Sequence, residues 1–147
     1  MRLGVDVGRV RVGVARSDPD GMIAVPVETV QRRGDAGPVV DRIVVIAAEV
    51  DAIEVVVGLP ISLSGGDTAS TADSRAVAEA IAARGLSVRL VDERLTTVSA
   101  QSALRASGRT TRGSRGVVDQ VAAVILLQHA LDAERARSAS SPDPERK

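Results

Sequence analysis

A nearly continuous run of β-branched residues at 53–57 constrains the fold of this 147-residue chain more than any other segment. It reads Ile-Glu-Val-Val-Val and is followed by Gly58, Leu59 and Pro60. A strand with one face in water alternates apolar and polar residues, whereas a strand covered on both faces is apolar almost throughout. The run therefore predicts a central strand in a sheet that carries helices on both sides.

Three apolar stretches before that run predict an antiparallel meander. They lie at about 2–6, 10–16 and 22–30. Gly8 and Arg9 separate the first two, and the turn-forming sequence Asp-Pro-Asp-Gly at 18–21 separates the second from the third. The chain thus reaches its central strand through three consecutive strands joined by short turns.

Helical patterns alternate with strands through the rest of the chain. Pro38 suits the first turn of a helix, and apolar positions at helical spacing continue to about Val50. The later elements expected are a helix from a cap at 64–67 to Arg84, a strand at 87–91, a helix from Thr96 or Thr97 to about Ala106, a loop at 107–116 and a helix at about 117–135. The order β-β-β-α-β-α-β-α-α predicts an α/β fold with one mixed five-stranded sheet and helices on both faces. We expect a single domain over residues 1–135 and a disordered tail at 136–147.

Composition excludes several classes of protein. Hydrophobic residues make up 44% of the chain, too many for a disordered protein, and no apolar stretch is long enough to span a membrane. The N-terminus lacks the apolar segment of a signal peptide, so a cytoplasmic location is expected. The absence of cysteine excludes thiolate nucleophiles and cysteine-bound zinc, and the one histidine, His129, lies on the apolar last helix, far from any serine-nucleophile motif.

Positive charge is concentrated in one segment, although the net charge is zero. Residues 94–115 contain no acidic residue and five arginines: Arg94, Arg105, Arg109, Arg112 and Arg115. A local basic surface of this kind suits a polyanionic substrate, so these arginines are candidate contacts to nucleic-acid phosphates. Arg9 and Arg11 flank the first predicted turn, where phosphate contact and plain solvent exposure are equally compatible with the sequence. The chain has no aromatic residue on which a base could stack.

Acidic residues from three distant parts of the chain could form one metal site. They are Asp6 in the first strand, the Asp92-Glu93 pair after the last strand, and Asp119 at the start of the final helix. Carboxylates are suitable ligands for Mg²⁺ or Mn²⁺, and two such ions can activate water in phosphodiester cleavage. The alternative interpretation gives each acid a local role, in a turn, in an ion pair with Arg94, or at a helix N-terminus.

Four blocks of this sequence, in this order, resemble the YqgF/RuvX family of Holliday junction resolvases. They are residues 4–15 (Gly-Val-Asp-Val-Gly-Arg-Val-Arg-Val-Gly-Val-Ala), 56–60 (Val-Val-Gly-Leu-Pro), 92–97 (Asp-Glu-Arg-Leu-Thr-Thr) and 118–127 (Val-Asp-Gln-Val-Ala-Ala-Val-Ile-Leu-Leu). The resemblance covers nearly the whole chain up to about residue 133. It implies an RNase H-like fold and a nuclease that depends on Mg²⁺ or Mn²⁺.

The same resemblance implies the site residues and the substrates. The family's metal-binding acids correspond to Asp6, Glu93 and Asp119, with Asp92 as an additional ligand or a supporting neighbour, while Arg94 would orient a carboxylate or contact a phosphate. Two nucleic-acid roles are implied, the resolution of four-way DNA junctions and the trimming of the 5′ end of precursor small-subunit ribosomal RNA. Junction resolution needs two symmetric nicks and hence a homodimer. Related resolvases often insert an aromatic residue at the junction centre, and this chain has none.

Two other functions are compatible with the sequence. One is a non-catalytic RNA-binding factor in ribosome biogenesis, which would keep the fold and bind RNA regardless of Asp6 or chelator. The other is an ATP-using protein of the sugar-kinase and actin type, because those proteins also open with an Asp-x-Gly hairpin. They close two such domains around the nucleotide, whereas this chain has the length of one.

Overall fold

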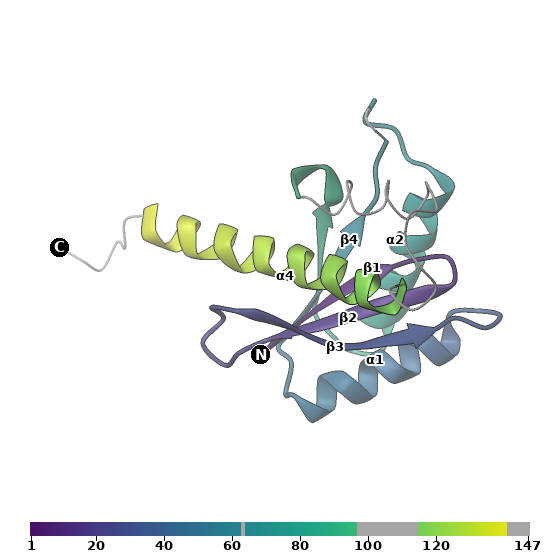
Figure 1. Cartoon of the computed structure of the whole chain (residues 1–147), viewed down its shortest axis with the longest axis horizontal. Coiled ribbons are helices and arrows are strands. Elements are labelled where there is room, and N and C mark those ends of the chain that lie inside the picture. Colours follow the sequence, from purple (N-terminus) through teal and green to yellow (C-terminus); the bar gives the residue numbers. More distant parts are fainter. Residues whose placement is uncertain (63, 97–114, 141–147) are drawn as a thin grey trace.

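The computed structural model describes residues 1–62, 64–96 and 115–140, and the side chains of 115–119 and 139–140 lie outside that description. Five strands form a mixed sheet in the order β3-β2-β1-β4-β5 (Figure 1). Their bounds are β1 Arg2–Val7, β2 Arg11–Ser17, β3 Ala24–Gln31, β4 Glu54–Leu59 and β5 Val88–Asp92. β1 pairs antiparallel with β2 and parallel with β4, so the meander and the parallel half of the sheet meet at β1. The predicted mixed five-stranded sheet is confirmed.

Two short turns hold the meander together. Gly8 donates its backbone N–H to the carbonyl of Arg11 over 3.0 Å and closes the β1–β2 turn. The Asp18 carboxylate accepts the backbone N–H of Met22 at 2.7 Å, and Gly21 adopts a φ of 69°, a conformation that glycine reaches without strain. Both turns lie where the turn-forming residues predicted them.

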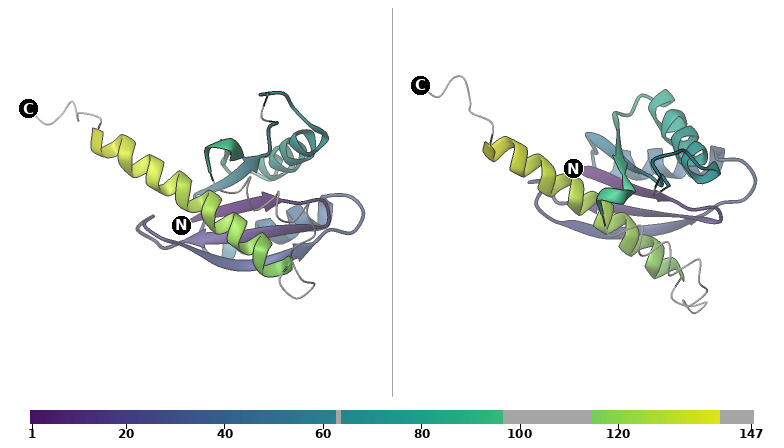
Figure 2. Two further views of the ribbon diagram at one scale, coloured as in Figure 1. Left: turned by 45° about the horizontal axis from the view of Figure 1, so that its top comes forward. Right: turned by 90° about the horizontal axis from the view of Figure 1, so that it is seen from above.

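Helices α1 (Gly37–Glu49) and α2 (Ala69–Ala83) cover one face of the sheet (Figure 2). α2 begins with a capping box, in which the Thr68 hydroxyl accepts the backbone N–H of Thr71 and the Thr71 hydroxyl accepts that of Thr68. The expected cap at 64–67 was therefore misplaced. The reciprocal threonine pair caps the helix, because each hydroxyl satisfies an amide of the first turn.

A long helix, α4 (Arg115–Ser140), crosses the opposite face over β1, β2 and β3 (Figures 1 and 2). The Gln128 side chain ties it to the sheet by accepting the backbone N–H of Ala24 at 2.9 Å. α4 continues beyond the end predicted near residue 135. The prediction ended with the apolar periodicity, whereas residues 136–140 are alanine, arginine and serine, of which alanine and arginine favour helix without packing.

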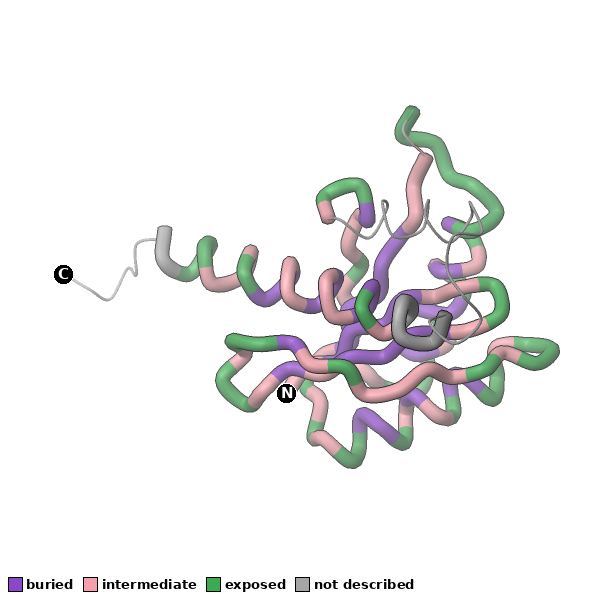
Figure 3. Tube along the Cα trace, viewed as in Figure 1, coloured by how far each residue is buried: buried purple, intermediate pink, exposed green. Residues whose placement is uncertain are grey.

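Buried residues form two clusters, one on each face of the sheet (Figure 3). The cluster beneath α1 and α2 consists mainly of branched aliphatic side chains. Five of the nine buried residues in the cluster beneath α4 are alanines, and Gly4 and Gly58 lie at close contacts on the same face. Val55, Val56 and Val57 are fully buried, alternating between the two clusters. The prediction that this strand is covered on both faces is confirmed.

Some predicted elements cannot be compared with the structure. The expected helix from Thr96 or Thr97 to about Ala106 lies outside the described residues, apart from Thr96 itself, and so does most of the expected 107–116 loop. Its last two residues, Arg115 and Gly116, belong to α4 and not to a loop. Within the described residues, no helix is both long enough and apolar enough to cross a membrane.

Candidate active site

Strand β1 places Asp6 on the face of the sheet that α4 covers. Side chains alternate along a strand, and Leu3 and Val5 point into the cluster beneath α1 and α2. Gly4 and Asp6 therefore face the other way, and a Cβ added at Gly4 would lie 2.7 Å from Cβ of Leu127 in α4. Asp6 is 3% exposed and sits across from Gly13 of β2. A carboxylate is thus built into the buried layer between the sheet and α4.

Glu93 approaches the same layer from the end of β5. It opens a short 3-10 helix, η1 (Glu93–Leu95), and is 4% exposed. A Cβ added at Gly58 of β4 would lie 2.6 Å from Oε1 of Glu93 and 3.1 Å from Cδ2 of Leu126. The Glu93 carboxylate therefore rests on β4 where Gly58 has no side chain, and any larger residue there would displace it.

Strand register brings Asp6 and Glu93 to one place. β1 and β4 run parallel, with Val5 opposite Val57. Continuing this register by one residue puts Asp6 beside Gly58, on a strand about 4.8 Å away. Two acids that are far apart in the sequence thus face the same layer at the carboxyl ends of β1 and β5, the two strands that flank β4. This is the juxtaposition that a shared metal site requires.

Asp92 points to the other face of the sheet from Glu93 and pairs with an arginine. Val91 packs in the α4-side cluster, so the alternation along β5 directs Asp92 toward the opposite face. Its carboxylate accepts hydrogen bonds from the Arg94 guanidinium at 2.6 Å and from the Arg94 backbone N–H at 2.9 Å. These bonds, the side-chain ones foremost, hold the pKa of Asp92 below its usual value. Metal ligation by Asp92 stays a prediction.

The remaining predicted site residues are only partly described. Asp119 belongs to the first turns of α4, but its side chain lies outside the description. The same holds for the side chain of Arg115, and Arg105, Arg109 and Arg112 lie wholly outside the described residues. Arg9 is exposed in the β1–β2 turn, Arg11 is half-buried at the start of β2, and Arg94 pairs with Asp92. The predicted basic surface over 94–115 therefore stays a prediction.

The donor chemistry of the two buried acids fits a divalent ion. Carboxylate oxygens are the ligands that Mg²⁺ and Mn²⁺ prefer, and two or three of them usually suffice, since phosphate oxygens and water complete the shell. In the part of the chain that the structure describes, no three Asp, Glu, His or Cys residues cluster closely enough to hold a metal. The third predicted ligand, Asp119, has its side chain outside that part.

Comparison with known proteins gives the family. The model of the family described as "RuvX: Holliday junction resolvase" matches residues 1–133. The chain belongs to the RuvX family. This assignment confirms the resemblance carried by the four sequence blocks, and it makes the chain a nuclease, a phosphodiester hydrolase.

Relatives of this RuvX chain are similar over nearly its whole length. A protein of Clavibacter sepedonicus named "Putative pre-16S rRNA nuclease" is 61% identical over 142 residues, which cover 96% of this chain and 87% of the relative. A protein of the same name from Mycolicibacterium smegmatis is 52% identical over 143 residues, with 95% and 84% covered. The structure of T. thermophilus RuvC in complex with a Holliday junction substrate superposes with a TM-score of 0.58 at 17% identity, covering 91% of this chain and 94% of that one. That likeness confirms the RNase H-like fold.

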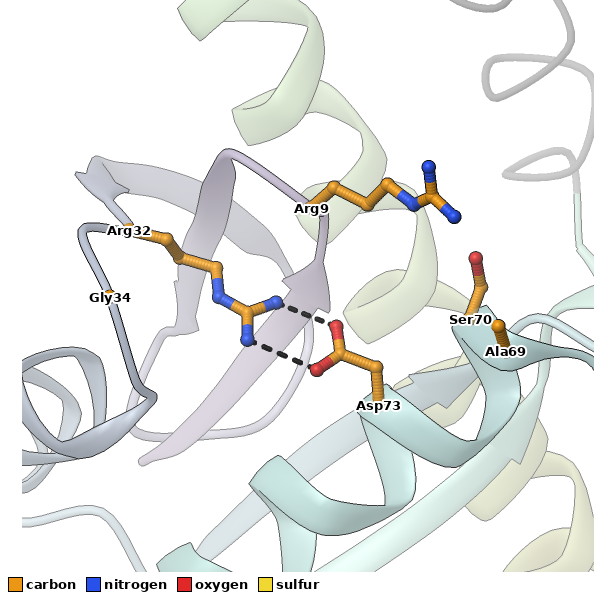
Figure 4. Close-up of a pocket in the computed structure, with 6 residues that line it drawn as sticks. All are labelled: Arg9, Arg32, Gly34, Ala69, Ser70 and Asp73. Carbon is orange, nitrogen blue, oxygen red and sulfur yellow. Dashed lines mark hydrogen bonds and ion pairs between the residues drawn. The ribbon is translucent and has the colours of Figure 1, made fainter.

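The RuvX chain also has a surface pocket that the sequence did not predict. It measures about 400 Å³ and lies between the β1–β2 turn and the start of α2, as Figure 4 shows. The lining residues are Arg9, Arg32, Gly34, Ala69, Ser70 and Asp73. Of these, Arg9 alone was a candidate site residue from the sequence. Arg32 and Asp73 are 41 positions apart, and no local spacing relates them before the fold brings them together.

Proposed function

We propose that this chain is a divalent-metal-dependent endonuclease that processes the precursor of small-subunit ribosomal RNA, with Asp6, Glu93 and Asp119 as its metal ligands. The observation that carries the proposal is the meeting of Asp6 and Glu93 in one buried layer beside Gly58. The names of the similar proteins favour precursor ribosomal RNA over a DNA junction as the substrate.

The burial of the two acids supports a cation site. Asp6 and Glu93 are both nearly inaccessible, and a buried carboxylate is costly unless cations or hydrogen bonds compensate its charge. Two carboxylates that face one layer also repel each other, which a divalent cation between them would relieve. Bound there, the ion would lower the pKa of a water molecule and stabilise charge on the scissile phosphate.

The surrounding residues hold the acids in position. Glu93 lies against Gly58, so the sheet backbone itself fixes where its carboxylate can be. Asp119 precedes Ala123 by one helical turn, and the Ala123 carbonyl would lie 2.9 Å from a Cβ at Gly4. α4 thus approaches β1 closely just after Asp119. A site built on strands and a packed helix keeps its geometry better than a site built on loops.

The test is cleavage of a labelled precursor 16S ribosomal RNA fragment and of a synthetic four-way DNA junction, each with Mg²⁺, with Mn²⁺ and with EDTA. Asp6→Asn and Glu93→Gln should fold normally and lose more than about 100-fold in cleavage rate, because even partners that merely support metal ligands cost 10- to 100-fold. Asp20→Asn and Glu79→Gln are matched controls, because these carboxylates are exposed. Both controls should cleave like the wild type.

Each other outcome has a defined meaning. Wild-type rates in Asp6→Asn would refute the metal site. Paired, symmetric nicks in the junction with no cleavage of the RNA would identify a junction resolvase and predict a homodimer. Binding of the RNA without cleavage, unchanged by EDTA and by Asp6→Asn, would identify a non-catalytic RNA-binding factor.

A further inference from the structure

We propose that the pocket between the β1–β2 turn and α2 binds a backbone phosphate of the nucleic-acid strand, at a subsite separate from the acidic pair. The inference rests on the proposed nuclease function, to which it adds a contact that fixes where the strand runs. Its residues come from three segments: Arg9 from the turn, Arg32 and Gly34 from the connection between β3 and α1, and Ala69, Ser70 and Asp73 from α2.

An ion pair forms the base of this pocket. Arg32 donates two hydrogen bonds to the Asp73 carboxylate, Nη1 at 2.6 Å and Nη2 at 3.0 Å. The Nη1 atom of Arg32 also donates to the carbonyl of Gly8 at 2.9 Å, so the same guanidinium holds the β1–β2 turn against α2. Hydrogen bonds from Arg32 hold the pKa of Asp73 below its usual value, so the carboxylate stays ionised and its charge is neutralised by Arg32.

Arg9 leaves the pocket with a net positive charge. Arg9 is exposed, and no ion pair to it is found among the described residues, although it lies near enough to Asp73 to help lower the pKa of that carboxylate. Figure 4 shows the Arg9 side chain extended above the Arg32–Asp73 pair, toward the side on which Ser70 lies. Two arginines and one aspartate therefore give the pocket one uncompensated positive charge. An exposed arginine presents several N–H donors in the planar arrangement that phosphate oxygens match.

The first turn of α2 adds uncharged donors to the same pocket. The capping box satisfies the amide of Thr71, and the amide of Ala72 donates to the carbonyl of Thr68. The amides of Ala69 and Ser70 come before the first of these bonds, at the helix end where anions are favoured. The Ser70 hydroxyl lines the pocket as well. Together with Arg9, these groups match the oxygens of a phosphate.

The pocket does not suit a base or an apolar group. Its non-polar lining is limited to Ala69 and Gly34, and the chain has no aromatic residue for stacking. The position of the pocket suits one continuous nucleic-acid strand that also reaches the acidic pair. Arg9 follows Asp6 by three residues in the turn after β1, and α2 follows the loop after β4. The pocket and the acidic pair thus share the carboxyl edge of β1 and β4. One nucleic-acid strand that crosses this edge can place a phosphate at each of them.

The test compares Arg9→Gln with Arg33→Gln, a change of equal charge at an exposed arginine outside the pocket. Binding of a fluorescent single-stranded RNA is measured by anisotropy at several salt concentrations in EDTA, so that binding is read without metal-dependent cleavage. The plot of log affinity against log salt has a negative slope. Loss of one phosphate contact in Arg9→Gln should reduce the magnitude of this slope by about 0.7, and Arg33→Gln should leave it unchanged. Arg9→Lys should recover most of the slope, because it restores the charge.

Other results would overturn the subsite. Identical slopes for the wild type and Arg9→Gln would do so, as would an equal change in Arg33→Gln. The RNA is used with a 5′-hydroxyl and with a 5′-phosphate, and an Arg9 effect confined to the 5′-phosphorylated form would replace the backbone phosphate by a terminal one. Because this assay reads binding without metal, the subsite can fail while Asp6-dependent cleavage stands, and cleavage can fail while the subsite stands.

Discussion

The two faces of the sheet carry different kinds of residue, although the same strands form both. The face under α1 and α2 is filled with valine, isoleucine and leucine, whereas the face under α4 has glycines where helix and sheet approach most closely. At Gly58 the absence of a side chain admits the carboxylate of Glu93, and at Gly4 it admits the backbone of α4. The first face is a packed core that stabilises the fold. The second also has a buried core, but the missing side chain at Gly58 leaves room in it for a carboxylate.

The largest expected effect is on folding stability, and it tests the role of the face under α1 and α2. Ile43 of α1 is fully buried, so Ile43→Ala should lower the free energy of unfolding by about 2 to 5 kcal/mol, measured by urea denaturation. Ile53→Ala is the control, because Ile53 is 65% exposed and should cost less than about 0.5 kcal/mol. Cleavage per folded molecule should be unchanged in both variants. Loss of cleavage in folded Ile43→Ala would mean that this face takes part in the site.

The second prediction tests the role of Gly58. Gly58→Ala would place a Cβ 2.6 Å from Oε1 of Glu93, so the carboxylate must move. We expect a stability cost of about 1 to 3 kcal/mol and a loss of cleavage of about 10- to 100-fold. Gly66→Ala is the control, because a Cβ at Gly66 meets nothing closer than 3.6 Å. Full activity in Gly58→Ala would show that the position of Glu93 does not matter for cleavage.

The third prediction concerns the Arg32–Asp73 pair, which ties α2 to the connection after β3. Asp73→Asn should lower the free energy of unfolding by about 1 kcal/mol at neutral pH, since the pair is partly exposed. Asp67→Asn is the control, because its ion pair with Arg75 is more exposed and should contribute less.

The same pair predicts a pH dependence with a definite sign. The pKa of Asp73 is lowered in the folded state, so its contribution is fully present above the unfolded-state pKa of about 3.9 and is lost as pH falls through the folded-state pKa. The stability difference between the wild type and Asp73→Asn should therefore be constant near neutral pH and shrink below about pH 4. A difference that persists at lower pH would show that the pair acts through packing and not through charge.

The smallest expected effect separates Asp92 from Glu93. Asp92 is held by Arg94 and directed away from the α4 face, so Asp92→Asn should change stability by less than about 0.5 kcal/mol. Its loss of cleavage should fall well short of that in Glu93→Gln, measured on the same RNA fragment. An equal loss in the two variants would add Asp92 to the metal ligands.

Local patterns in the sequence were sufficient for the elements of the fold. The three apolar stretches and their turns predicted β1 to β3, and the apolar run at 53–57 predicted a strand covered on both sides, because periodicity and turn preference act over a few residues. Helix ends were less well predicted. Thr68 caps α2 one position after the expected segment, and α4 continues past its last apolar contact. Helix boundaries depend on capping hydrogen bonds and on helix propensities, neither of which can be read from hydrophobic spacing.

Tertiary structure alone decided which residues meet. The sequence marked Asp6 and Glu93 as candidates, but the register of β1 against β4 and the missing side chain at Gly58 put the two acids in one layer. The residues alone left Asp92 and Glu93 as alternatives, and the family resemblance favoured Glu93. The alternation of β5 and the bonds from Arg94 to Asp92 gave the two acids different surroundings. The pairing of Arg32 with Asp73 had no signal at all in the sequence. Local elements follow from short-range preferences, whereas contacts between distant residues depend on how those elements pack.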